Sequence, residues 1–143
     1  MKKLACILLV MSSSAFAVNH EVKMLNSNEH GSMMFEPMVL KANVGDTVTF
    51  KAVNKSHFVK SMAVPEGAQK FASEEDQEIT ITLDKDGLYV YTCPVHRAMN
   101  MNGIIQVGND IPNKAQAEKA VLDLEKKAMS NKGRLLKAFE EIK

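Results

Sequence analysis

Short stretches in which apolar and polar residues alternate constrain the fold of this chain most. Residues 47–53 (TVTFKAV) and 78–83 (EITITL) place every second side chain on the same face of an extended strand. Asp-Lys-Asp-Gly at 84–87 is typical of a turn, with glycine free to adopt positive φ. Short strands separated by such turns predict a mainly β fold, a β-sandwich. The other predicted strands are 20–25, 88–93 and 103–107, while 27–31 is predicted as a polar turn and 33–41 as an apolar segment around Pro37.

The hydrophobic period changes after residue 108, where two series of apolar residues recur at helical spacing. Asn113 is positioned to cap the first helix, and Ser130 or Asn131 the second. Mixed charges and the lack of tryptophan or tyrosine favour packing of these helices onto the sandwich over binding to a membrane surface. The first series is Ala117, Val121, Leu124 and Ala128, and the second is Leu135, Phe139 and Ile142.

The first seventeen residues have the pattern of an export signal. Lys2 and Lys3 precede an apolar run at 4–11, and Ala-Phe-Ala at 15–17 matches the small residues that signal peptidase requires. The apolar run is too short to cross a bilayer as a helix. We therefore expect a signal peptide at 1–17, cleavage after Ala17, and a periplasmic mature chain at 18–143.

The mature chain of 126 residues is long enough for one domain with its own core. We assign 18–108 to the sandwich and 112–143 to the helices. Loss of the two leader lysines leaves 16 basic and 17 acidic residues, a formal net charge of −1. This balance argues against general nucleic-acid binding, which needs a strong basic excess. We expect a monomer with no stable membrane insertion.

Cleavage would remove Cys6 and leave Cys93 as the single cysteine of the mature chain. No internal disulfide is then possible. Because cysteines in an oxidising compartment are usually paired, a single free thiol there indicates a role other than a disulfide. A free cysteine is often a small buried hydrophobe. The residues around Cys93 favour a metal ligand instead.

Cys93 begins a short loop that also carries His96 and two methionines, Met99 and Met101. His57 lies 36 residues upstream, just after a predicted strand. One thiolate, two imidazoles and one thioether form the donor set of a blue copper site, with a long axial methionine. Structural zinc sites use no thioether, and a second cysteine is missing here, so copper is favoured over zinc.

The chain resembles the cupredoxins, and within them the pseudoazurins, over nearly all of 18–143. The features that carry this resemblance are the metal-loop spacing, GSMMFEP at 31–37, VPEGAQKF at 64–71 and the two C-terminal helices. The resemblance implies an eight-stranded Greek-key β-sandwich with one type 1 copper at one end. It also implies the copper ligands His57, Cys93, His96 and Met101, which selects Met101 over Met99.

The chain departs from the cupredoxin pattern at two positions beside the ligands. Phe58 stands where the family usually has asparagine, so only its backbone N–H can donate there. Val95 precedes His96 where the family usually has proline, and Pro94 instead follows Cys93. Hydrogen bonds and local hydrophobicity tune the potential of a blue copper site. The family's potential therefore does not carry over to this chain.

The predicted function is electron transfer, because the ligand set leaves no coordination position for a substrate and no acid–base pair accompanies it. The resemblance implies redox partners such as copper nitrite reductase or a c-type cytochrome, and a hydrophobic docking face around His96. Lys55, Lys70 and Arg97, with Lys60, are candidate docking residues. The alternative is copper storage or delivery through the methionines at 33, 34, 38 and 62.

Overall fold

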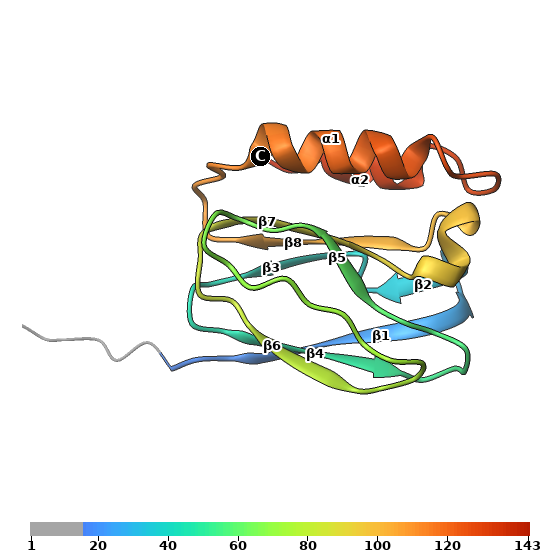
Figure 1. The fold of residues 1–143 in the computed structure, drawn as a ribbon, viewed down its shortest axis with the longest axis horizontal. Coiled ribbons are helices and arrows are strands. Elements are labelled where there is room, and N and C mark those ends of the chain that lie inside the picture. The colour runs from blue at the N-terminus through green and yellow to red at the C-terminus, as the bar shows by residue number, and fades with distance from the viewer. Residues whose placement is uncertain (1–15) are drawn as a thin grey trace, which may run out of the picture.

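Residues 16–143, the part that the computed structural model describes, form eight strands, one 3-10 helix and two α-helices (Figure 1). The predicted signal peptide lies almost entirely outside these residues. The first four strands are β1 (Asn19–Asn28), β2 (Gly31–Glu36), β3 (Val39–Ala42) and β4 (Thr47–Ala52). The other four are β5 (Lys60–Ala63), β6 (Ile79–Thr82), β7 (Gly87–Thr92) and β8 (Asn102–Val107). The helices are η1 (Pro94–Met99), α1 (Lys114–Glu125) and α2 (Arg134–Glu140).

The strands form two four-stranded sheets that stack as layers (Figure 1). One sheet has the order β2-β1-β4-β6 and the other β3-β8-β7-β5. β1 pairs in parallel with β4, and β3 in parallel with β8, while the remaining pairs are antiparallel. The parallel pairs require the chain to cross between the sheets. The prediction of an eight-stranded Greek-key sandwich with two C-terminal helices is confirmed.

Aromatic side chains from several strands fill the space between the sheets. The ring of Tyr91 meets Phe35 edge-on at a centroid distance of 4.8 Å and Phe50 at 5.0 Å. Phe71 stacks on Phe50 at 5.6 Å. In β4 only the alternate side chains, Val48 and Phe50, are fully buried, as the period-two pattern predicts.

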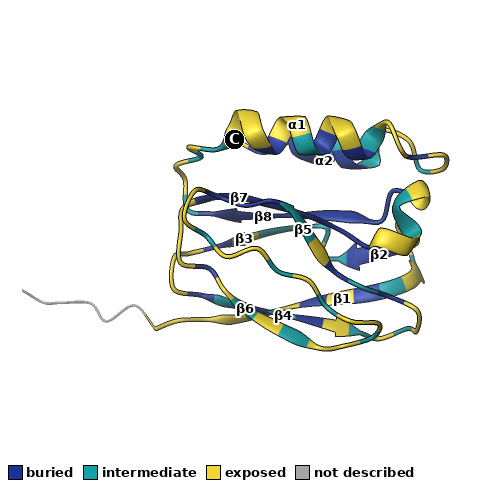
Figure 2. Ribbon diagram, viewed as in Figure 1, coloured by how far each residue is buried: buried dark blue, intermediate teal, exposed yellow. Residues whose placement is uncertain are grey.

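β7 and β8 are buried along their whole length because both of their faces are covered (Figure 2). The sandwich core covers one face, and the two α-helices cover the other. Val121 and Leu124 of α1 and Leu135 of α2 are fully buried against this sheet. The predicted packing of the helices on the sandwich is thus confirmed. Neither α-helix within 16–143 has the length and apolarity to span a membrane.

Several element boundaries differ from the sequence prediction. The predicted turn at 27–31 shrinks to Glu29 and His30, because β1 and β2 pair as far as Asn28 and Gly31. β2, β3 and β5 had no individual strand prediction, since none of them alternates cleanly. These segments are strands because they pair with neighbouring strands. The order of apolar and polar residues within each segment does not reveal that pairing.

The helix caps also differ from the prediction. Asn113 occupies the N-cap position of α1, but its side chain bonds the backbone N–H and C=O of Leu88 at 2.8 Å each instead of the helix. α2 starts after Gly133, in the left-handed conformation, so neither Ser130 nor Asn131 caps it. The carboxylate of Glu125 accepts the N–H groups at the start of α2 instead, a long-range substitute for a local cap.

Gly103→Ala tests the close approach of β7 and β8. Tyr91 faces Gly103 across the two strands, and a Cβ at residue 103 would overlap the phenol ring, which is rigid and fully buried. We expect the free energy of unfolding to fall by about 1–3 kcal/mol in a denaturant titration. Tyr91→Phe should cost much less, because the Tyr91 hydroxyl has no hydrogen-bond partner. Wild-type stability for Gly103→Ala would contradict this packing.

Candidate metal centre

The loop from Cys93 to Met101 is closed at its base by strand pairing. Thr92, the last residue of β7, pairs with Asn102, the first residue of β8. The next residues in line, Cys93 and Met101, are joined by a Cys93 N–H to Met101 C=O hydrogen bond of 2.9 Å. Cys93 and Met101, two candidate copper ligands that are eight residues apart in sequence, therefore lie directly opposite each other in space.

The interior of this loop is the 3-10 helix η1, and local residues explain its shape. Pro94 occupies the first turn, where the missing N–H costs nothing. Asn100 ends the helix in the left-handed conformation with φ of 56°, and its N–H bonds the carbonyl of Arg97 at 3.0 Å. His96 has non-helical dihedrals, φ −114° and ψ 22°. The kink keeps its imidazole beside Cys93, with Nδ1 3.4 Å from the sulfur.

The two methionines of the loop occupy different environments. Met101 is fully buried in the same core cluster as Cys93. Met99 is 41% exposed. Only Met101 therefore lies on the interior side of the loop with the cysteine, and the geometry is compatible with its choice over Met99.

His57 reaches the same place from the loop between β4 and β5. Its Nε2 lies 2.9 Å from Oδ1 of Asn26, an acceptor, so Nε2 carries the proton and donates. Its backbone N–H donates to Asp76 Oδ1 at 3.0 Å, and its carbonyl accepts the Asp76 N–H at 2.8 Å. These bonds fix both the tautomer and the position of the ring, with the lone pair on Nδ1.

That Nδ1 atom is buried and has no hydrogen-bond partner. An unpaired buried nitrogen is unfavourable unless something binds it. His57, Cys93 and His96 offer ligand atoms that all lie within 4.8 Å of one another, and the two imidazole centroids are 5.0 Å apart. Two nitrogens and a sulfur at this spacing fit a single copper ion.

Burial sets the electrostatics of the centre. It lowers the pKa of His57, and the neighbouring His96 lowers it further, against a smaller opposing effect of Asp76. A neutral imidazole with a free lone pair is the form that binds metal. Burial also raises the pKa of the Cys93 thiol, while backbone N–H groups, first that of Phe58, act in the opposite direction. The backbone N–H of Phe58 thus donates toward the Cys93 sulfur. This is the one donor that was expected from Phe58, because its side chain has no amide.

Three polar residues that were not predicted from the sequence connect this loop to the C-terminal helices: Asn100 within the loop, Glu125 of α1 and Arg134 of α2. Asn100 donates through Nδ2 to Glu125 Oε1 and to the carbonyl of Asn131, each at 2.9 Å. Hydrogen bonds from Asn100 and from the start of α2 outweigh burial and lower the pKa of Glu125. The carboxylate is therefore ionised and links the metal loop to the helical hairpin.

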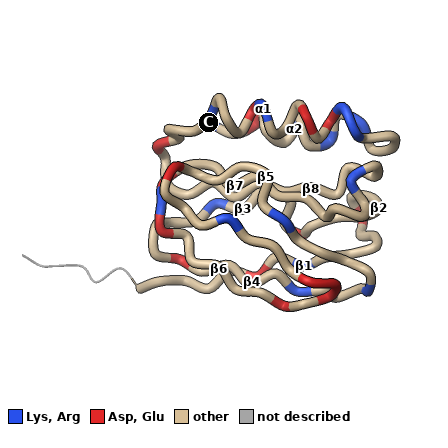
Figure 3. The backbone as a smooth tube through the Cα atoms, viewed as in Figure 1, with Lys and Arg blue, Asp and Glu red and all other residues tan. Residues whose placement is uncertain are grey.

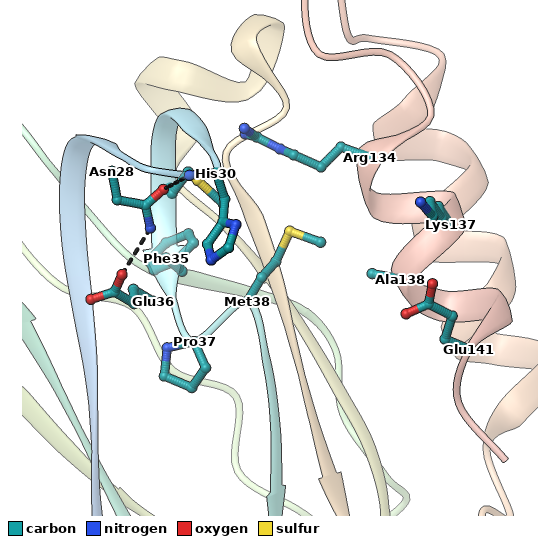
Figure 4. Close-up of a pocket in the computed structure, with 11 residues that line it drawn as sticks. Asn28, His30, Phe35, Glu36, Pro37, Met38, Arg134, Lys137, Ala138 and Glu141 are labelled. Atoms are coloured by element: carbon teal, nitrogen blue, oxygen red, sulfur yellow. Dashed lines mark hydrogen bonds between the residues drawn. The ribbon is translucent and has the colours of Figure 1, made fainter.

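The third residue is Arg134, whose side chain extends from α2 toward the strands (Figure 4). Its guanidinium donates to the carbonyls of Ser32 and Met33, at 2.8 and 2.7 Å, and to those of Met99 and Asn100, at 3.2 and 2.7 Å. Arg134 therefore joins β2, the metal loop and α2. No local pattern marks it, because its acceptors are backbone atoms about 35 and 100 residues away.

Lysines and arginines occur on both layers of strands and on the C-terminal helices (Figure 3). The candidate docking residues among them lie at different distances from the site. Lys55 is exposed two residues before His57, and Arg97 is half-buried in η1 with Nη2 4.0 Å from the sulfur of Met62. Lys60 pairs with Thr92, next to Cys93. Lys70 instead lines a groove with Asp84 and Tyr89, nearer the start of β7 than its Cys93 end.

The methionines considered for copper storage or delivery do not cluster around one point. Met34 and Met38 line a cleft of about 520 Å³ between β2 and α2, shared with the cations Arg134 and Lys137 (Figure 4). Met62 lies on β5, in contact with Arg97. The same cleft is also lined by the carboxylates of Glu36 and Glu141, so its charges are mixed. The separation of Met62 from Met34 and Met38, and not charge, is what speaks against a methionine-rich copper site.

Comparison with known proteins agrees with this geometry. The profile of a family described as copper binding proteins, plastocyanin/azurin family, matches residues 22–108, more than half of the chain. The chain belongs to this family. Pseudoazurin from Paracoccus pantotrophus is 40% identical over 117 residues, which are 80% of each chain.

Solved pseudoazurin structures share the fold over almost their full length. That of Hyphomicrobium denitrificans superposes with a TM-score of 0.73 at 30% identity, over 88% of this chain and 99% of that chain. The structure from Methylobacterium extorquens AM1 gives 0.71 at 30% identity, over 87% and 99%. The chain is thus a cupredoxin with pseudoazurin relatives, of the blue copper electron-transfer class and not an enzyme.

Arg134→Met tests whether the helical hairpin holds the metal loop. The change removes every hydrogen bond of the guanidinium, including those to the partly buried carbonyls of Met33 and Asn100, so we expect the free energy of unfolding to fall by about 1–3 kcal/mol. The visible band of the copper form should also shift, because the Met99–Asn100 segment is released. Lys137→Met is the control, since it removes an exposed charge one turn away. Equal effects of the two variants would contradict a specific role of Arg134.

Proposed function

We propose that this chain is a periplasmic electron carrier that binds one type 1 copper through His57, Cys93, His96 and Met101. The observation that carries the proposal is the buried, unpartnered Nδ1 of His57 beside the Cys93 thiol and the His96 ring. A lone pair with no hydrogen-bond donor, next to a buried sulfur, has no evident structural use. A metal ion satisfies both.

When bound, copper supplies a one-electron couple between Cu(II) and Cu(I). The chain contributes ligands that are held in place before and after the electron moves. Cys93 and Met101 are tied to each other across the strand ends, and Asn26 and Asp76 fix His57. Because these bonds tie the loops to the ends of β7 and β8 and to β1, they limit the rearrangement that each transfer requires.

We propose that electrons pass through the His96 edge of the site. His57 and Cys93 are fully buried, whereas His96 is only half-buried and lies on a loop that also exposes apolar side chains. Val95 is 59% exposed and Met99 41%. A partner that docks over this face comes closer to His96 than to any other proposed ligand. Lys55, Lys70 and Arg97 would orient an acidic partner around it.

The proposed location follows from the leader. Cleavage after Ala17 would release residues 18–143, which include all eight strands and both C-terminal helices of the described chain. Ala17 and Val18 are exposed and lie immediately before β1, so the cleavage point interrupts no element. In the periplasm we propose copper nitrite reductase or a c-type cytochrome as redox partners, through a complex formed by the monomer.

Exchanging single ligands tests the copper assignment. Cys93→Ser should abolish the intense visible band, because the band requires a thiolate, while the fold persists. Met101→Leu should keep copper but shift the reduction potential, since the axial contact is weak and long. Met99→Leu is the matched control on the same loop and should leave the potential near wild type. A blue Cys93→Ser protein, or a larger shift in Met99→Leu, would contradict the assignment.

Charge reversal tests the docking face. We expect Lys55→Glu to lower the second-order rate of electron transfer to an acidic partner by roughly 2- to 10-fold at low salt. The difference should shrink as salt screens it, with a Debye length of about 8 Å at physiological ionic strength. Lys70→Glu should have a smaller effect because of its distance from the ligand end of β7. Lys85→Glu, in the turn before β7, is the control. Identical rates for Lys55→Glu and Lys85→Glu would refute a basic docking face.

A further inference from the structure

A buried carboxylate at the end of the sandwich opposite the metal centre accepts hydrogen bonds from the start of β1 and from the turn that follows β3. Asp46, in the turn before β4, has only 3% of its surface exposed. Its Oδ2 accepts the Asn43 N–H at 3.0 Å and the His20 Nε2 at 2.8 Å. The Asn43 hydrogen bond, then that of His20, and then that of Val18 hold the pKa of Asp46 at about 2. The carboxylate is therefore ionised at neutral pH.

The remaining oxygen of this carboxylate faces the start of β1. Asp46 Oδ1 accepts the N–H of Val18 at 3.0 Å, and the Val18 carbonyl accepts the Thr47 N–H at 3.0 Å. Among residues 16–143, the one ion pair of Asp46 is with His20, which is charged only when protonated. At neutral pH, then, the buried negative charge has no permanently cationic partner in the described chain.

We propose that signal-peptide cleavage supplies that partner: the new α-ammonium of Val18 forms an ion pair with Asp46 and anchors β1. The inference rests on the cleavage site given under the proposed function. Hydrolysis of the Ala17–Val18 peptide bond adds one water, leaving a carboxylate on Ala17 and an amine on Val18, which is protonated at neutral pH. The nitrogen that already donates to Asp46 as an amide then donates as a cation, and charge-assisted hydrogen bonds are stronger.

The position of β1 makes this contact consequential. β1 lies between β2 and β4, and its parallel pairing with β4 begins at Asn19 and Thr47, next to the ion pair. A cation fixed at Val18 therefore holds the register of two central strands at their first residues. A precursor that retains Ala17 has the same hydrogen bond without the charge, and so folds into a less stable sandwich.

The experiment compares three forms of the apoprotein in urea: the chain from Val18 with a free amine, the same chain with an acetylated amine, and the chain that retains Phe16 and Ala17. The acetyl group keeps an N–H toward Asp46 and removes only the charge. At pH 6.5 we expect the unfolding equilibrium constant to be roughly five- to tenfold higher for both blocked forms than for the free amine. In Asp46→Asn the three forms should unfold alike.

A titration of the α-amine by NMR gives a second readout that does not depend on how well Asp46→Asn folds. The titratable groups around the amine are Asp46, from the turn before β4, which the Val18 nitrogen contacts directly, and His20, from β1, which bonds the other oxygen of the Asp46 carboxylate. The pKa of the amine should lie above the ordinary value of about 7.7. Its stabilisation is then complete below about pH 7.7 and disappears as the pH rises through the higher folded value.

Equal stability of the free and acetylated forms, or a difference that persists in Asp46→Asn, would overturn the proposal. An α-amine with an ordinary pKa in the folded protein would do so as well. Sequencing of the exported protein from its N-terminus would also overturn it if the chain started at any residue other than Val18. None of these outcomes affects the copper spectrum, which tests the proposed function separately.

Discussion

The hydrogen bond between the Cys93 N–H and the Met101 carbonyl is the contact on which the metal centre depends. It continues the β7–β8 ladder one step beyond Thr92 and Asn102, so the rigidity of the sheet extends directly into the loop. The cysteine and the methionine share the movement of two fully buried strands instead of that of a surface loop. Because β7 and β8 are covered on both faces, a change in either covering layer reaches the site through them.

His57 lies on the loop that leads from β4 of one sheet to β5 of the other, and different interactions hold it in place. Its buried ring donates the Nε2 proton to Asn26 of β1, and its backbone is bonded to Asp76 in both directions. The same contacts leave Nδ1 without a partner in the site. These contacts therefore fix the tautomer and leave the lone pair free, while burial and then the neighbouring His96 lower the pKa of His57 against the opposing effect of Asp76. The site thus draws on both sheets: Asn26 of β1 orients the His57 ring, while Cys93 and His96 follow β7 of the other sheet.

The C-terminal helices support the site as well as covering the sheet. Their apolar faces were predictable from residues such as Val121 and Leu135, since helical spacing reports burial. The polar contacts were not. The carboxylate of Glu125 accepts hydrogen bonds both from the backbone N–H groups at the start of α2 and from Asn100 in the Cys93–Met101 loop. No local capping pattern contains this combination. Predictions from local caps fail here because the first turn of α2 finds its acceptor on another helix.

The sequence by itself determined the fold class, the helical segment and the chemical identity of the site. Alternation specifies strands, and a lone cysteine followed by histidine and methionine at fixed spacing specifies a soft metal, since both depend on residues that are close along the chain. Tertiary structure decided the rest: that Met101 is buried and Met99 exposed, that Asn26 and Asp76 orient His57, and that Arg134 ties α2 to the loop. These choices join residues roughly 20 to 100 positions apart. Backbone carbonyls and amides carry several of them, and every residue type has those groups, so no sequence pattern records the pairing.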